Sequence, residues 1–404
     1  MNGDLRHMLN PLTAVTDHDP YPYYAELVAT KPLYYDAVLG MWVASSAAAV
    51  AAVFENPNCR VRPTAEPVPK HLLESPAAEI FRQLIRMSDG ADHCPLKHAV
   101  TATLAAVDAV DAIAQSNRWA NVLALRYGIR ETPEQFANFT LHLSVYVLGS
   151  LLGIPEAMLP QTARWVHDFV GCLVPASGAE QIERGKHASA ALQNTFRSLL
   201  HTQQLQSTNS LLARLADEAH QNGDTDTERI IANGIGLLSQ AYEATAGLIG
   251  NTLLALAAHT DVRSAITTHP EYLQNAIHET LRYDAPVQNT RRFLAETGVV
   301  AHQPMQAGAT ILLVLAAANR DPHANPAPAQ FDLWRKNRQH FTFGLGTHAC
   351  PGEALAPTIA TAGVAQLLQT DIWSHIPEHI AYRASTNVRM PIISGVSTLS
   401  RRTK

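Results

Sequence analysis

The sequence predicts a mainly α-helical fold with small peripheral β-sheets. Long stretches with the 3.6-residue periodicity of helices fill the middle of the chain, and short strand-like stretches lie towards both ends. No internal repeat, low-complexity block or Gly/Ser-rich linker divides the sequence. We therefore expect residues 1–404 to form a single compact domain, with a helix-rich core and β-rich N-terminal and C-terminal portions.

The predicted elements follow in chain order. Val38–Val43 is typical of a turn and a strand, and Ser45 or Ser46 is a candidate N-cap for a helix over Ala47–Phe54. Strands are predicted at Leu33–Ala37, Met41–Ala44, Val299–His302, Thr310–Leu315 and Ile392–Leu399. Longer helices are predicted at Glu134–Leu152, Pro160–Val174, Ala179–Gln204, Asp226–His259, Glu271–Tyr283 and Glu353–Leu368.

The composition excludes several classes of protein. Hydrophobic residues make up 47% of the 404 residues and charged residues 16%, which is enough apolar material for a large core and excludes a mostly disordered chain. The formal net charge of -5 gives no sign of the basic surface that nucleic acid favours, so we expect no nucleic-acid partner. Neither a GxGxxG nor a GxxxxGK[ST] motif is present, so nucleotide cofactors are not supported.

The sequence also bears on the compartment. The N-terminal residues lack the apolar core of a secretory signal. The uncharged stretch Ala37–Phe54 contains a predicted turn, strand and helix cap, which argues against a membrane span. The cysteines Cys59, Cys94, Cys172 and Cys350 are far apart and form no CxxC pair, so a disulfide framework or structural zinc site is not expected. We expect a cytoplasmic protein with reduced cysteines.

The strongest functional signal surrounds Cys350, in the sequence HFTFGLGTHACPG over His340–Gly352. A thiolate that binds iron needs a tight loop against a flat macrocycle, N–H donors directed at the sulfur, and shielding from water. The glycines of the loop, among them Gly344, suit the close approach, and Phe343 suits the shielding. The positive end of the following predicted helix favours an anionic sulfur. The alternative is a buried structural cysteine in a glycine-rich turn.

The complete motif, Phe-x-x-Gly-x-His-x-Cys-x-Gly, resembles the haem-thiolate loop of the cytochrome P450 family in its bacterial soluble form. The resemblance covers nearly the whole chain. Other segments are similar to family motifs: Asp19–Tyr23, Glu279–Arg282, Ala318–Pro322 and Phe331–Arg335. The resemblance implies the cytochrome P450 fold, haem b with its iron axially ligated by the Cys350 thiolate, and an oxidoreductase of the monooxygenase type.

The resemblance also implies a structural role for Glu279 and Arg282. They are three residues apart and share one helical face, so by themselves they would be a weak surface pair. In the family the pair is buried, bonded to Arg335 or a neighbour, and fixes the proximal side of the haem.

Haem carries two carboxylates, which need cationic donors. The resemblance implies that His93, Lys97, Arg292 and His348 supply them. Lys97 stands where the family has arginine, so it keeps the charge and loses the bidentate geometry. Arg291 is adjacent to Arg292 and is easily confused with it. For each donor, the alternative is a solvated surface residue.

The predicted helix Asp226–His259 is similar to the family's oxygen-activating helix, with one departure. In the register set by Leu248–Asn251, the family's acid is Glu243, and Ala244 occupies the position of the proton-relaying threonine. Thr245 matches the family's second hydroxyl. Activation of dioxygen needs two protons, and the Ala244 side chain can neither donate nor accept one.

Three explanations for Ala244 stay open. A hydroxyl or amine of the substrate holds the proton-donating water, or Thr245 or Gln240 substitutes with the help of a local helix bulge. Otherwise the reaction does not need ordinary oxygen cleavage. We favour substrate assistance slightly. Gln240 stands where the family has a small residue, and it is a candidate to face the distal ligand of the iron. The alternative is that Gln240 and Glu243 only pack or hydrogen-bond within the helix.

We therefore expect a haem-thiolate monooxygenase that oxidises a small, secondary-metabolite-like organic substrate with O2 and two electrons. A separate ferredoxin or flavodoxin-type protein would donate the electrons, and we expect a monomer. The alternatives are another haem-thiolate reaction (oxidative coupling, ring formation, nitration or peroxide-driven oxidation) and a non-catalytic haem-binding protein. The resemblance assigns the roof of the substrate pocket to Arg60–Met87, Phe169–Gln181, Val287–Thr290 and Ser385–Val396.

Overall fold

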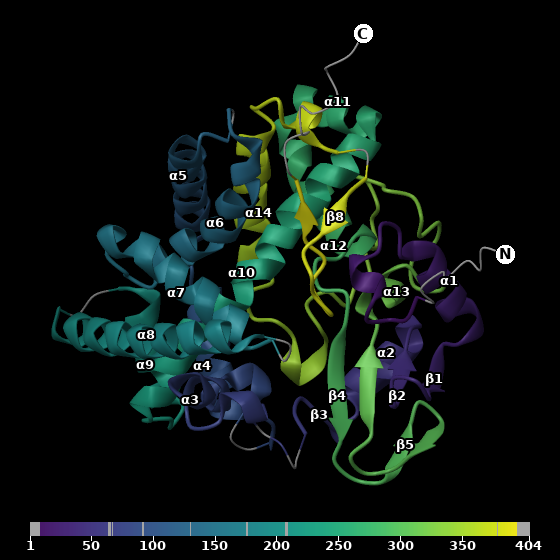
Figure 1. Ribbon diagram of the computed structural model, residues 1–404, viewed down its shortest axis with the longest axis horizontal. Helices are drawn as coiled ribbons and strands as arrows, with labels where there is room; N and C mark the ends of the chain where they lie inside the picture. The colour runs from purple at the N-terminus through teal and green to yellow at the C-terminus, as the bar shows by residue number, and fades with distance from the viewer. Residues whose placement is uncertain are drawn as a thin grey trace.

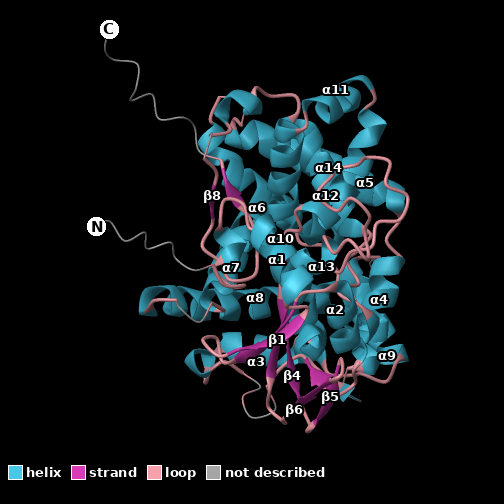
Figure 2. Ribbon diagram, turned by 90° about the vertical axis from the view of Figure 1, so that its right-hand side faces the viewer, coloured by secondary structure: helices cyan, strands magenta, loops and turns pink. Residues whose placement is uncertain are grey.

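Helices fill most of the molecule, and a small β-sheet lies at one end of it (Figures 1 and 2). The structure is a computed structural model of the 404-residue chain. It describes residues 9–393 except 64, 65, 67, 91, 92, 130, 175, 176, 207, 208 and 378. The predicted fold class, mainly α with small peripheral sheets, is confirmed.

The elements have the following bounds. The α-helices are α1 Tyr21–Thr30, α2 Ala47–Glu55, α3 Pro76–Gln83, α4 Cys94–Ala105, α5 Ala109–Tyr127, α6 Phe136–Leu151, α7 Leu159–Cys172, α8 Ala179–Gln206, α9 Leu211–Gln221, α10 Thr227–Ala258, α11 Thr260–Thr268, α12 Leu273–Tyr283, α13 Leu315–Asn319 and α14 Leu355–Leu367. The strands are β1 Leu33–Asp36, β2 Met41–Ala44, β3 Cys59–Arg60, β4 Thr290–Leu294, β5 Gly298–Val300, β6 Gln303–Met305, β7 Thr310–Leu313, β8 Ala381–Tyr382 and β9 Pro391–Ile392.

The predicted helices over the middle of the chain are all present, with ends that differ by a few residues. Ser46 caps α2 as predicted, since its hydroxyl accepts a hydrogen bond from the Ala49 N–H at 3.2 Å. The helix predicted from Glu353 begins two residues later, at Leu355, because the residues after Cys350 first form a turn. Helices α1, α3, α5, α9, α11 and α13 were not among the predicted elements.

Four predicted strands end earlier than expected, and the one predicted over Leu33–Ala37 ends one residue early, at Asp36. The strand predicted over Val299–His302 ends at Val300, because Ala301 and His302 adopt positive φ values of 45° and 65°. The strand predicted over Thr310–Leu315 ends at Leu313, and Leu315 begins α13. For the strand predicted over Ile392–Leu399, β9 ends at Ile392, and residues 394–399 lie outside the described residues.

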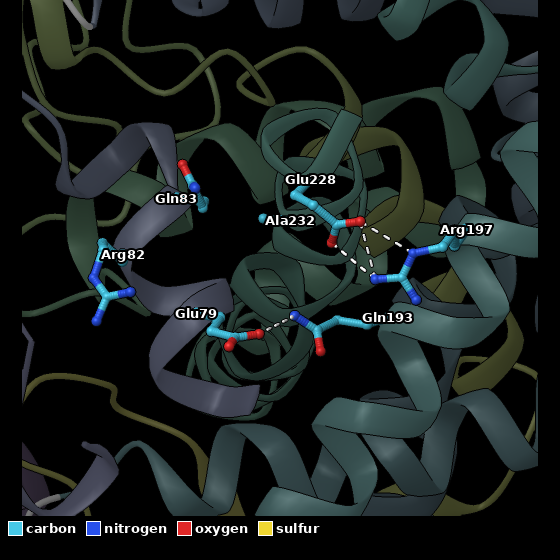
Figure 3. A pocket seen from close by; sticks show the side chains of 7 residues that line it. All are labelled: Glu79, Arg82, Gln83, Gln193, Arg197, Glu228 and Ala232. Atoms are coloured by element: carbon cyan, nitrogen blue, oxygen red, sulfur yellow. Dashed lines mark hydrogen bonds and ion pairs between the residues drawn. The ribbon is translucent and has the colours of Figure 1, made fainter. Parts of the chain in front are cut away.

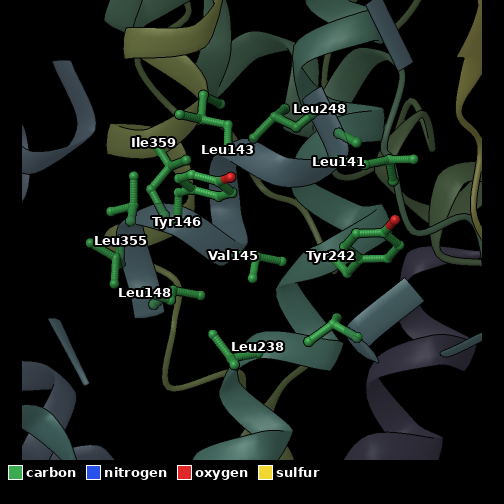
Figure 4. Packing of buried hydrophobic residues seen from close by; sticks show 14 of the residues in the cluster. Leu141, Leu143, Val145, Tyr146, Leu148, Leu238, Tyr242, Leu248, Leu355 and Ile359 are labelled. Carbon is green, nitrogen blue, oxygen red and sulfur yellow. The ribbon is translucent and has the colours of Figure 1, made fainter. Parts of the chain in front are cut away.

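Helix α10 runs through the centre of the molecule (Figure 1). Its side chains are buried around most of its circumference, as expected for a helix that is apolar on all faces. Asp226 caps its N-terminus, since its carboxylate accepts hydrogen bonds from the Glu228 and Arg229 N–H groups at 3.0 and 3.4 Å. Figure 4 shows side chains of α6 and α14, such as Leu143 and Ile359, packed in the same cluster as Leu248 of α10.

The largest sheet has the strand order β1-β2-β7-β4-β3. Strands β2 and β7 are parallel, and the other neighbouring pairs are antiparallel. In β4, Arg292 lies opposite Ile311 of β7 and is buried, whereas the adjacent Arg291 is exposed. The alternation of a strand therefore separates these two neighbouring arginines onto opposite faces of the sheet.

Within the part of the chain that the structure describes, no helix is long and apolar enough to cross a membrane. The uncharged stretch Ala37–Phe54 contains β2 and most of α2, as its pattern predicted.

Gly247 allows α10 to lie directly against two other segments. A Cβ atom at this position would lie 2.7 Å from the carbonyl oxygen of Arg389 and 3.1 Å from Cβ of Pro286. The first distance is shorter than any normal packing contact. This close approach is one helical turn beyond Glu243, so it brings both segments beside the predicted site.

We expect Gly247→Ala to lower the free energy of unfolding by up to about 2 kcal/mol. Overpacking against the backbone costs about 1–3 kcal/mol, which outweighs the roughly 0.8–1 kcal/mol that alanine gains in helix propensity. Chemical denaturation of the full chain measures the change. Gly178→Ala is the control, because a Cβ there meets no atom within 4 Å. A gain in stability of about 0.8–1 kcal/mol in Gly247→Ala, the value of helix propensity alone, would contradict the close approach.

Candidate functional site

The loop that carries Cys350 is folded back on itself by short backbone hydrogen bonds. The Cys350 N–H donates to the Phe343 carbonyl at 2.7 Å, and the Gly344 N–H donates to the Phe341 carbonyl at 2.8 Å. Gly344 and Gly346 have φ values of 73° and 68°, which a side chain would disfavour. The predicted tight loop is therefore present, and two of its glycines are needed for its turns.

The Cys350 sulfur is accessible to solvent although protein surrounds it. The side chain is exposed and forms no disulfide. Burial nevertheless raises the pKa of its thiol, against the lowering effects of a hydrogen bond from the Gly352 N–H and of the Lys97 charge. The residue is therefore accessible to a group that binds it, and one donor is already directed at its sulfur.

A second set of hydrogen bonds fixes the start of the loop to the end of α12. Asn319 is completely buried; its amide N–H donates to the Leu281 carbonyl at 3.2 Å and its amide oxygen accepts from the Phe341 N–H at 2.7 Å. The Thr342 hydroxyl also donates to the Leu281 carbonyl, at 2.6 Å, and accepts from Asn319. Because all these groups are buried, the loop is held at a fixed position relative to Leu281.

Glu279 and Arg282 of α12 are fully buried and paired, with 2.7 Å between Arg282 Nη2 and Glu279 Oε1. The same carboxylate also binds Arg335 and Arg338, each at 3.1 Å, and accepts the Asp332 N–H at 3.2 Å. Burial lowers the pKa of Arg282, an effect that Glu279 opposes. The bond to Arg335 agrees with the prediction, whereas Arg338 was not predicted.

The excess positive charge around Glu279 is stabilised by backbone carbonyls. The remaining N–H groups of Arg282 donate to the Pro328 and Gln330 carbonyls at 2.8 and 2.9 Å. Arg335 donates to the Pro326 carbonyl at 2.7 Å. These bonds order the segment between α13 and the Cys350 loop, because one carboxylate and its cations hold it along its length.

The polar residues expected to bind the haem carboxylates gather near one another. The rings of His93 and His348 lie 4.5 Å apart, and His348 Nε2 lies 3.2 Å from Asp89 Oδ1. Burial lowers the pKa of His93 to about 4, with the charges of His348 and Lys97 adding to the effect. Arg292 is buried, and its guanidinium lies 4.9 Å from the Phe54 ring centroid and interacts with the Asp89 charge.

Lys97 lies in different surroundings from His93, His348 and Arg292. Its ammonium donates a hydrogen bond to the Ala349 carbonyl, directly before Cys350, and burial lowers its pKa while the charge of Cys350 raises it. It therefore lies beside the cysteine rather than beside Asp89. The donor set of two imidazoles, a buried guanidinium and an ammonium, next to an accessible thiol, fits the carboxylates and iron of haem.

Asp89 was missed by the sequence analysis. Burial raises the pKa of its carboxyl, but bonds from His348 and from the Val61 N–H outweigh burial and leave the pKa lowered. No local pattern marked this residue, because its partners come from segments distant in the sequence.

The candidate residues Gln240, Glu243, Ala244 and Thr245 lie on consecutive turns of α10. Glu243 is half-buried and lies 3.6 Å from Arg383, a partner that the sequence did not suggest. Ala244 is half-buried, and Thr245 is 2% exposed. The Gln240 side chain is exposed, and its amide donates to the Gly236 carbonyl of the preceding turn at 3.0 Å.

The segments expected to roof the pocket are joined in two pairs by hydrogen bonds. The Gln288 N–H donates to the Asn387 carbonyl at 2.8 Å, and the Asn289 amide donates to the Thr386 carbonyl at 2.7 Å. His71 Nε2 lies 3.1 Å from the Cys172 carbonyl at the end of α7. Residues 64, 65, 67, 175, 176 and 394–396 of these segments lie outside the described residues.

Two surface recesses lie elsewhere. One, of about 400 Å³, is polar and lies between α3, α8 and α10, where Arg197 binds Glu228 and Gln193 binds Glu79 (Figure 3). The other, of about 520 Å³, is lined by residues of α11 and of the segment Ala329–Trp334. Neither includes a residue of the Cys350 loop or of Gln240–Thr245, so neither is the candidate site.

Comparisons with known proteins agree with the geometry. The family model described as "Cytochrome P450" matches residues 179–379. The "Biotin biosynthesis cytochrome P450" of Bacillus subtilis (strain 168) is 24% identical over 87% of this chain and 89% of its own length. The "6-deoxyerythronolide B hydroxylase" of Saccharopolyspora erythraea is 30% identical over 57% of this chain, a match that spans about half (55%) of that protein. The crystal structure of CalO2 superposes with a TM-score of 0.80 at 26% identity, covering 95% of this chain and 96% of CalO2.

We expect Glu279→Gln to destabilise the protein by about 3–5 kcal/mol, because the substitution leaves buried arginines without their counter-charge. Equilibrium unfolding of the full chain measures the loss. Glu156→Gln is the matched control: Glu156 binds Arg118 on the surface, where an ion pair contributes about 0–1 kcal/mol. If the two substitutions had equal effects, the structural role of Glu279 would be refuted.

Proposed function

The chain belongs to the cytochrome P450 family, and on this premise we propose that Cys350 is the thiolate ligand of its haem iron. Members of the family are haem b enzymes with a cysteine thiolate ligand, and the chain is a monooxygenase-type oxidoreductase. The observation that carries the assignment is the accessible Cys350 sulfur in a loop held to α12. When bound, the haem supplies the chemistry that inserts one atom of O2 into an organic substrate, using two electrons.

The residues around Cys350 hold and tune that site in this proposal. Gly344 permits the close approach of the loop, and Phe343 shields the sulfur. The Gly352 N–H is directed at the sulfur and limits its basicity. Lys97 adds a positive charge close to the thiolate, which favours the anionic form.

His93, Arg292 and His348 bind the haem carboxylates, with Lys97 as a fourth cation. Arg292 is suited to this role because it is buried, and Arg291 lies on the other face of β4. Asp89 lies 3.2 Å from His348 Nε2 and fixes the orientation of the His348 ring, which binds a haem carboxylate in this proposal.

Glu243 delivers protons to the site, and the side chain of Ala244 leaves no hydroxyl to relay them. The Arg383 guanidinium lies 3.6 Å from the Glu243 carboxylate and orients it. The Gln240 amide is already bonded to Gly236, which makes it a poorer substitute than a group on the substrate. We therefore assign the proton relay to a hydroxyl or amine of the substrate. Thr245 is the alternative relay within the helix.

The substrate in this proposal is a small, secondary-metabolite-like molecule, and the relative named as a 6-deoxyerythronolide B hydroxylase supports this class. Electrons come from a separate ferredoxin or flavodoxin-type protein, which docks transiently on the Cys350 side. The chain acts as a monomer of one domain in the cytoplasm. A second candidate, favoured by Ala244, is a haem-thiolate enzyme of oxidative coupling, ring formation, nitration or peroxide-driven oxidation.

We expect the haem-loaded protein to form product with O2 and a reductant, and to incorporate one labelled oxygen atom from labelled O2. With a substrate that lacks a hydroxyl or amine, Ala244→Thr should raise the yield of product per electron by up to about 10²-fold, the lower end for a well-placed proton donor. With the native substrate the effect should be small, because the substrate already supplies the donor. Product analysis beside reductant consumption measures both yields.

Peroxide alone is the comparison that separates the two candidates. Product from peroxide, and none from O2 with reductant, would favour the second candidate over the monooxygenase. A large gain by Ala244→Thr for every substrate would argue against substrate assistance.

A further inference from the structure

The side chain of Arg389 connects the hairpin formed by β8 and β9 to the N-terminal segment of the described chain. It is buried, and its guanidinium donates to three backbone carbonyls: Val15 at 2.9 Å, Asp17 at 2.7 Å and His18 at 3.0 Å. Asp284 Oδ1 lies 3.1 Å from Arg389 Nε and supplies the counter-charge. Because the donors of a guanidinium are rigid and planar, several acceptors at once allow only one position for it.

The backbone of Arg389 lies directly on α10. Its carbonyl oxygen would lie 2.7 Å from a Cβ at Gly247, and it accepts a hydrogen bond from the Asn251 amide at 3.3 Å. Its N–H donates to the Pro286 carbonyl at 2.8 Å. Gly247 and Asn251 follow Glu243 by four and eight residues, so the three lie on one face of the helix. The hairpin therefore lies along the face of α10 that carries Glu243.

The same hairpin carries the partner of Glu243. The Arg383 N–H donates to the Met390 carbonyl at 2.9 Å, so Arg383 is paired in the hairpin with the residue next to Arg389. The Arg383 guanidinium lies 3.6 Å from the Glu243 carboxylate. The Arg383 side chain is 33% exposed, whereas that of Arg389 is 2% exposed. The buried arginine is therefore the fixed point of the hairpin, and the position of the exposed arginine depends on it.

We propose that Arg389 is a positioning residue, which holds Arg383 in place against the Glu243 carboxylate. This inference rests on the proposed function, because it takes Glu243 as the group that moves protons at the haem. The Arg389 side chain acts through the backbone of the hairpin. Its acceptors Val15 and His18 are 374 and 371 residues away in the sequence, so the N-terminal segment supports the candidate site from outside it.

The test uses hydrogen peroxide as the oxidant and the dye ABTS as the electron donor, so it needs neither the native substrate nor a redox partner. One peroxide and two protons become two waters, while two dye molecules each lose one electron. Cleavage of the O–O bond needs proton transfer to the leaving oxygen, the step proposed for Glu243. With the haem-loaded full chain, Glu243→Gln should lower the rate by about 10²-fold, the lower end for a positioned acid–base group.

Arg389→Lys should lower the rate by about tenfold. The single ammonium cannot reach three carbonyls as the guanidinium does, and a misplacement of about 1 Å costs up to about 10²-fold. Arg383→Gln should lower the rate by a similar factor. The double variant should be no slower than Arg383→Gln alone, since Arg389 acts through Arg383. A further tenfold loss in the double variant would overturn the inference, as would an unchanged rate in Arg389→Lys.

Val15→Ala is a second variant, for the case that Arg389→Lys does not bind haem. Val15 is fully buried and its carbonyl accepts from Arg389, so a cavity at this position loosens the N-terminal acceptors. Hydrogen exchange of the Arg383 N–H, which is bonded to Met390, reports on the hairpin without any measurement of activity. Val15→Ala should speed this exchange and slow the dye reaction.

Ile266→Ala is the matched control for Val15→Ala. Ile266 is buried in α11, and its truncation also leaves a cavity in the core, so it destabilises the fold without touching the hairpin. It should change neither the exchange of the Arg383 N–H nor the rate of the dye reaction. Equal exchange in Val15→Ala and Ile266→Ala would refute the support of the hairpin by the N-terminal segment.

Failure of the proposed function gives a different result. A natural chain whose reduced form lacks the carbon monoxide Soret band of thiolate-bound haem would refute the haem site itself. An unchanged rate in Glu243→Gln would refute the proton transfer by Glu243. A slow Glu243→Gln beside a natural rate in Arg389→Lys would refute only the role of Arg389.

Discussion

The carboxylate of Glu279 is the interaction on which the arrangement around Cys350 depends. It is fully buried and binds Arg282 of its own helix together with Arg335 and Arg338 from the segment before the cysteine loop. A buried ion cluster of this kind adds little net stability over an apolar core, but it is costly to leave incomplete. The cluster therefore fixes one position for the segment that carries Arg335 and Arg338. The hydrogen bonds of Asn319 and Thr342 to the end of the same helix then carry that position to the loop.

The side of the candidate site that α10 forms is built differently. The buried faces of α10 set its position, and Gly247 lets the loop after α12 and the segment at Arg389 approach it. The same approach explains why the partner of Glu243 is Arg383, which lies six residues before Arg389. Glu243 and its partner are therefore positioned by packing. The missing hydroxyl at Ala244 makes the substrate itself responsible for a contact that the protein does not supply.

Patterns within short segments predicted much of this. The periodicity of α10, the cap at Ser46 and the glycines of the Cys350 loop are local, so the sequence indicates them directly. The pair of Glu279 with Arg282 is also local, whereas the bond of Arg338 to Glu279 spans 59 residues and carries no such signal. Asp89 and Arg383 were missed for the same reason. The start of α14 was predicted two residues early, because a turn and a helix N-terminus have similar sequences.

The central claim is that the Cys350 sulfur binds iron. The most direct measurement is the absorption spectrum of the reduced, haem-loaded protein under carbon monoxide, for the natural chain and for Cys350→His. The account predicts a Soret band at the long wavelength typical of thiolate-bound haem in the natural chain, and its loss in Cys350→His. A band at the shorter wavelength typical of histidine-bound haem in the natural chain, or no haem uptake at all, would contradict it.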